Sequence, residues 1–145
     1  MKTKILLAMA LGAAIGLLSN HATALAQEHK DHKEHKESGG KVKVPDTVEG
    51  IWKEIHKHHT ELADTVKAKQ LADVHHLAFA IRDLAKALPA KAHPDHKKMV
   101  ENAVKRISQI AEDLDKSGDA GNQAATEANL KKFDTALKNL EEHTK

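Results

Sequence analysis

The spacing of apolar side chains over roughly the last hundred residues constrains the fold most strongly. Between residues 48 and 140 they recur at alternating steps of four and three, which is the spacing of one face of an α-helix. The pattern changes phase near Lys69, which favours a turn there over one long bent helix, although no glycine or proline marks it. The sequence therefore predicts an all-α fold with helices over about 47–68, 71–88, 95–116 and 120–143.

The predicted ends of these helices also follow from residue types. Asp46 is expected to be an N-cap with Glu49 three residues later, as in a capping box. Pro94 suits the first turn of the third helix, Gly118 suits a C-terminal cap, and Asp119 suits the next N-cap. Because all connections are short, we expect residues 45–145 to form an antiparallel up-down-up-down four-helix bundle.

The first 26 residues have the pattern of a secretory signal peptide. Lys2 and Lys4 precede an apolar run at residues 5–18, and Ala24-Leu25-Ala26 supplies a small-residue cleavage site. A retained amphiphilic anchor is the alternative, but the apolar run is short for a membrane span. The chain has no cysteine, which excludes disulfides and thiolate metal sites. We therefore predict a periplasmic protein that is cut after about Ala26.

Residues 27–44 form a polar tail that repeats the triplets "HKD HKE HKE" and is expected to be disordered. Cleavage would leave Gln27 at the N-terminus and His29 at position three. An amine, two backbone nitrogens and an imidazole can surround Cu(II) or Ni(II) in a plane, unless Gln27 cyclises. His32 and His35 would add imidazoles, so the tail is a candidate metal-capture element, or otherwise a solvated polar segment.

The remaining histidines fall at two kinds of position. In the predicted bundle His93, His96 and His143 lie at the same end, which makes them a second candidate site for zinc, copper or nickel. A loop histidine and a fraying C-terminal histidine are the alternative interpretation. His59 lies on the predicted core face, where it is either a hydrogen-bonded core histidine or a metal ligand with His75 nearby.

Composition argues against several functions. The formal charge of +2 falls to zero once Lys2 and Lys4 are removed, so there is no basic field for nucleic acid. Aromatic residues make up only 2% of the chain, which disfavours base stacking. Serines are few and lie in the signal, the linker or on helix surfaces, and no catalytic constellation is visible. We therefore expect a non-enzymatic protein with no stable membrane span after cleavage.

The histidine-rich tail and helical domain resemble small exported proteins that accompany heavy-metal resistance and efflux systems. The resemblance implies a periplasmic protein that sequesters or hands over a divalent metal, with copper or nickel first and zinc next. An alternative is a helical interaction module that docks an efflux or sensor partner, with histidines as a pH or metal switch. The architecture is also similar to the haem protein cytochrome b562. However, Val48, Ile51 and Trp52 stand where that family uses a methionine, so haem is disfavoured.

Overall fold

The computed structural model describes residues 42–145, which are all-α as predicted. No strand occurs within this range. The predicted signal peptide and the tail residues Gln27, His29, His32 and His35 lie outside the described residues. The four helices are α1 (Val48–Lys67), α2 (Val74–Ala85), α3 (Lys97–Asp119) and α4 (Gln123–Glu142), and the 3-10 turns η1 (Leu71–Asp73) and η2 (Leu88–Ala90) flank α2.

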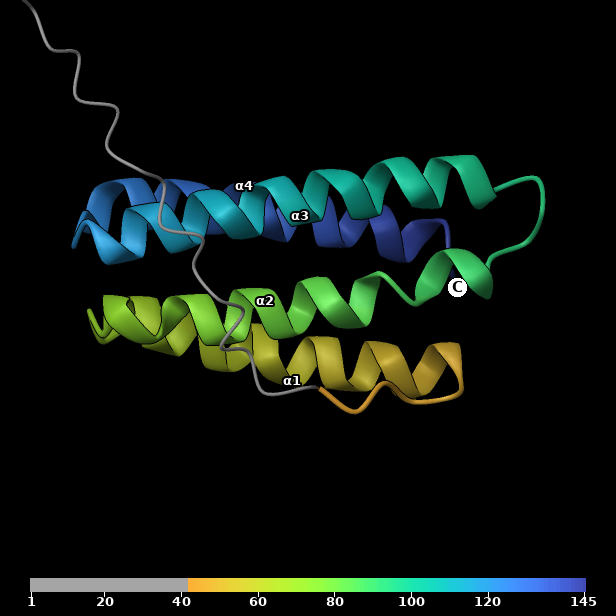
Figure 1. Ribbon diagram of the computed structural model, residues 1–145, viewed down its shortest axis with the longest axis horizontal. Helices are drawn as coiled ribbons and strands as arrows, with labels where there is room; N and C mark the ends of the chain where they lie inside the picture. Colours follow the sequence, from red (N-terminus) through yellow and green to blue (C-terminus); the bar gives the residue numbers. More distant parts are fainter. Residues whose placement is uncertain (1–41) are drawn as a thin grey trace, which may run out of the picture. The chain divides into compact units, whose positions relative to one another are not determined.

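Helices that follow one another in the chain pack against one another. α1 packs on α2, α2 on α3 and α3 on α4, whereas α1 and α4 meet less closely (Figure 1). The apolar stripes read from the sequence supply the core, and burying each large side chain stabilises the fold by about 1.5–3 kcal/mol. The largest fully buried side chains are Trp52, Phe133, Ile51, Ile55, Leu62, Ile81, Leu84, Leu88, Ile107, Leu114, Leu140 and Val66.

The turn predicted near Lys69 is confirmed, and its geometry shows how α1 ends without a glycine. Lys69 adopts φ 60° after the end of α1. Its N–H donates to the Val66 carbonyl at 3.1 Å, and the Gln70 N–H donates to the Thr65 carbonyl at 3.0 Å. These two bonds form a Schellman motif, which usually places glycine at the left-handed position. Lysine there costs about 1 kcal/mol or more, and the bonds offset that cost.

Three expectations about helix ends were wrong. The N-cap of α1 is Thr47 rather than Asp46, because the Thr47 hydroxyl accepts a hydrogen bond from the Gly50 N–H at 3.0 Å. Pro94 lies in a turn that precedes α3 and is not part of its first turn. The N-cap of α4 is Asn122, whose side chain accepts from the Ala125 N–H at 3.1 Å.

The junction between α3 and α4 differs most from the expectation. α3 does not end at Gly118 but continues to Asp119, and Gly121 is the glycine with φ 62°. Gly118 is needed for a different reason: a Cβ at this position would lie 2.7 Å from the Leu71 carbonyl oxygen. The last turn of α3 therefore lies directly against η1, which only a residue without a side chain allows.

None of the helices in residues 42–145 combines the length and the apolar character that a bilayer span requires.

Candidate metal centre

Three imidazoles from separate segments gather beside the end of α4. His93 lies in the loop after η2, His96 immediately precedes α3, and His143 caps α4. The ring centroids of His93 and His96 are 6.2 Å apart, and those of His96 and His143 are 6.1 Å apart. Figure 1 likewise shows the C-terminus beside the segment that joins α2 to α3. We call this group of three the imidazole pole; its role as a metal site stays a prediction.

Two ring separations in the pole, His93 to His96 and His96 to His143, are slightly longer than those of imidazoles that share an ion. With metal–nitrogen bonds of about 2.0 Å, two imidazoles on a tetrahedral ion have ring centroids about 5 Å apart. The observed separations exceed this by about 1 Å, which side-chain rotation can close. The His93 side chain is 70% exposed and only 3.4 Å from Asp95. Within residues 42–145, neither the His96 nor the His143 imidazole makes a hydrogen bond that metal binding would have to break.

Contacts with α1 hold the end of α4 in position. The Trp52 indole N–H donates to the Thr144 hydroxyl at 2.9 Å. His56 Nε2 lies 3.3 Å from a Glu141 carboxylate oxygen, and Lys145 also pairs with Glu141. The hydrogen bond from Lys145 lowers the pKa of Glu141, and the charge of His56 adds to the effect against the opposing influence of partial burial. These contacts fix the backbone that carries His143.

His59 is not in the core, contrary to the position predicted for it. Its side chain is 30% exposed, and its Nε2 lies 2.6 Å from a carboxylate oxygen of Asp134 on α4. His75, the possible second ligand, instead lies close to α3. The shared site of His59 and His75 is therefore absent from the described helices, and His59 links α1 to α4.

His75 belongs to a cluster that the sequence did not reveal. One ligand atom each from His75, Asp115 and Asp119 lies within 4.8 Å of the others. It is the one group of three or more potential ligands, by this measure, that residues 42–145 contain. The sequence signal was the four-residue spacing of the two aspartates, which places them on one face of a helix. We missed it because Asp119 was assigned to the start of α4 rather than to the last turn of α3.

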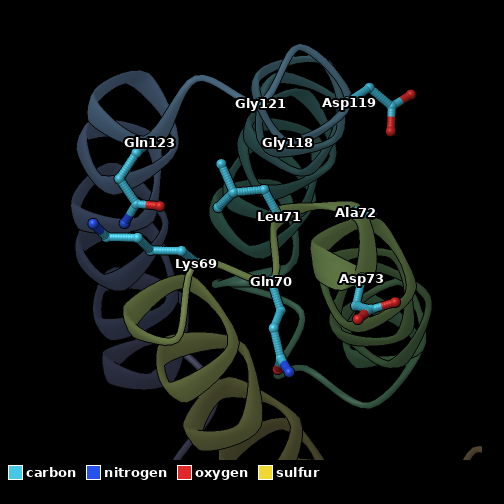
Figure 2. A pocket seen from close by; sticks show the side chains of 9 residues that line it. All are labelled: Lys69, Gln70, Leu71, Ala72, Asp73, Gly118, Asp119, Gly121 and Gln123. Atoms are coloured by element: carbon cyan, nitrogen blue, oxygen red, sulfur yellow. The ribbon is translucent and has the colours of Figure 1, made fainter.

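A shallow hollow lies beside this cluster. It has a volume of about 540 Å³ between η1 and the α3–α4 junction, and its lining includes Leu71, Gln123 and Asp119. Figure 2 shows the Asp119 carboxylate pointing outward, away from Leu71 and Gln123. Asp119 thus lines the edge of the hollow, whereas His75 and Asp115 are not among its lining residues.

Comparison with family models, with curated proteins and with solved structures finds no match.

Proposed function

We propose that this protein is an exported, non-catalytic four-helix protein that binds a divalent late first-row metal ion and sequesters it or hands it over. The observation that supports this most strongly is the convergence of His93, His96 and His143 from three separate segments. Imidazole nitrogens favour copper, nickel and zinc over magnesium or calcium. The absence of cysteine and the small number of methionines argue against a Cu(I) site.

We propose an up-down-up-down order for the helices, which contacts between their ends support. Gln123, at the start of α4, donates to the carbonyl of Val66, near the end of α1, at 2.9 Å. Gly118, in the last turn of α3, adjoins Leu71 before the start of α2. Such contacts between opposite ends are those that an antiparallel bundle requires.

In the proposed mechanism the tail captures the ion and the pole receives it. The described chain begins at Val42, and the Asp46 carbonyl accepts a hydrogen bond from the Lys91 ammonium at 2.5 Å. The segment that continues from the tail therefore lies beside the loop that carries His93.

Copper titration of the full chain tests the role of the pole, with fluorescence as the readout. Trp52 is the only tryptophan, and it is hydrogen bonded to the residue after His143. A Cu(II) ion at the pole should therefore quench it. The triple variant His93→Gln, His96→Gln and His143→Gln is expected to weaken the copper-dependent quenching at least about tenfold. His58→Gln, which alters a histidine paired with Glu61 on α1, is the matched control.

The tail is tested separately by substituting its histidines in the full chain. The variant His29→Gln, His32→Gln and His35→Gln should slow or weaken copper capture, measured by calorimetry, while the pole still quenches Trp52 at higher copper concentration. A wild-type chain that binds no copper, nickel or zinc at neutral pH would refute the proposed function. The alternative function, a helical module that docks an efflux or sensor partner, would then be favoured.

A further inference from the structure

We infer a second metal site of different chemistry, formed by His75, Asp115 and Asp119 at the other end of α2. His75 lies in the first turn of α2, whereas the imidazole pole begins beyond its last turn. The ligands are one imidazole and two carboxylates, and we assign zinc as the ion. This inference is independent of the proposed function of the pole and the tail.

The fold builds the site through Gly118. Because the last turn of α3 lies against the Leu71 carbonyl, the segment that leads into α2 is held close to α3. Asp115 and Asp119 are four residues apart in α3 and therefore face the same side. His75 enters from α2, so the three ligand atoms come within 4.8 Å of one another. Two separate helices thus supply the ligands.

The His75 imidazole is prepared for metal binding by its backbone contact. Its Nδ1 lies 2.8 Å from the carbonyl oxygen of Ala72. Because a carbonyl oxygen only accepts, Nδ1 must carry the proton, and in the neutral ring Nε2 then holds the free lone pair. Metal-binding histidines usually have this arrangement, in which a carbonyl fixes the tautomer and the ring orientation. The ring of the neighbouring His76 lies 3.7 Å away, centroid to centroid, but His76 supplies no ligand atom to the cluster.

The charges at this end favour a cation. Asp115 and Asp119 lie in the C-terminal part of α3, where the helix dipole is negative and carboxylates are disfavoured. The side chain of the partly buried Asp115 makes no hydrogen bond or ion pair within residues 42–145. A divalent ion would neutralise both carboxylates and interact favourably with the helix end.

The donor set points to zinc rather than to calcium or magnesium. Zinc accepts imidazole and carboxylate ligands, and three protein ligands leave a fourth position for water. Calcium takes six to eight oxygen ligands, which this group does not offer. Ligand atoms around a tetrahedral zinc ion lie about 3.3 Å apart. The ligand atoms would therefore have to approach one another by at most about 1.5 Å, and the exposed Asp119 can rotate to do so.

The test uses the full chain without the candidate histidines of the tail and the pole. Zinc affinity is measured by calorimetry, and Co(II) provides a visible spectrum of the same site. In the variant chain, called the background, we expect one ion to bind per chain. Bound Co(II) should give the absorption typical of tetrahedral cobalt, and added zinc should abolish that absorption. The background carries six substitutions in the tail and the pole: His29→Gln, His32→Gln, His35→Gln, His93→Gln, His96→Gln and His143→Gln.

Matched pairs of neighbouring residues then identify the ligands. His75→Gln and Asp119→Asn should each weaken zinc binding at least about tenfold. His76→Gln and Asp113→Asn, which alter neighbours outside the cluster, should change it less than twofold. If His75→Gln disrupts folding, as judged by circular dichroism, the exposed Asp119 still provides the comparison with Asp113.

Two outcomes would overturn the inference. The first is a background chain that binds no zinc. The second is an equal loss of zinc affinity in the cluster variants His75→Gln and Asp119→Asn and in the control variants His76→Gln and Asp113→Asn. Failure of the pole is recognised separately, because the background already lacks it. Zinc binding here together with unchanged copper quenching in the pole variant would retain this site and refute the role proposed for the pole.

Discussion

Replacing Gly118 by alanine should destabilise the protein, although alanine is the better helix former. The new Cβ would lie 2.7 Å from the Leu71 carbonyl oxygen and 3.5 Å from Val74 Cβ. The first distance is about 0.7 Å below an ordinary van der Waals contact. The opposing atom belongs to the backbone, so it cannot rotate away. α3 and η1 must therefore move apart.

The magnitude follows from two opposing terms. Overpacking a close contact costs up to about 3 kcal/mol, and we take this upper value because the backbone itself must shift. Alanine returns about 1 kcal/mol through its higher helix propensity. Gly118→Ala should therefore lower the free energy of unfolding by about 2 kcal/mol. For a domain of this size the midpoint of thermal unfolding should fall by about 10 °C.

Circular dichroism during thermal and urea unfolding measures this change, with Gly121→Ala as the control. Gly121 has φ 62°, and a Cβ added there would have no neighbouring atom within 4 Å, so alanine introduces local strain only. Gly118→Ala should also weaken zinc binding at His75, whereas Gly121→Ala should not. If Gly118→Ala is as stable as the wild type, the close contact between α3 and η1 does not limit the packing.

Three further predictions concern other contacts. Trp52→Phe loses the hydrogen bond to Thr144 and part of a buried ring system, so unfolding should become easier in urea by more than about 1 kcal/mol. Partial burial raises the pKa of Asp83, but hydrogen bonds and charges from Arg82 and Lys86 outweigh it and lower that pKa overall. The resulting stability is present above the unfolded pKa of about 3.9 and is lost as the pH falls through the folded value. Asp83→Asn should therefore be less stable than the wild type by at most about 0.5 kcal/mol at pH 7, because the site is partly exposed, and the difference should vanish in acid titrations of unfolding. A chain kept in free zinc at a hundred times the dissociation constant of the site should lose about 2.7 kcal/mol of stability when EDTA removes the zinc. The loss should be seen as a lower melting temperature.

The helices and the core faces could be predicted because both depend on local periodicity. Repeated steps of four and three identify the buried side of a helix whatever it packs against. The fully buried Trp52, Ile55 and Leu62 lie on the stripe predicted for α1, and the phase change located the turn at Lys69. His59 departs from this pattern because a polar ring on the edge of that face moves outward to reach Asp134.

The ends of the helices were less predictable because residue type alone leaves several choices. Gly118 suits a C-terminal cap by composition, yet it serves a close contact with a residue distant in the sequence, and Gly121 provides the left-handed turn. Assigning Asp119 to the wrong helix then separated it from Asp115. The cluster with His75 could not be recognised from that assignment.

The order of residues along the chain was enough to establish the helical class, the buried faces and the concentration of His93, His96 and His143 near one end. Local periodicity and short connections are sufficient for these features. The meeting of His75 with Asp115 and Asp119, by contrast, follows from packing in three dimensions. It depends on how closely α3 approaches the start of α2, and a missing Cβ sets this distance between residues that are far apart in the chain.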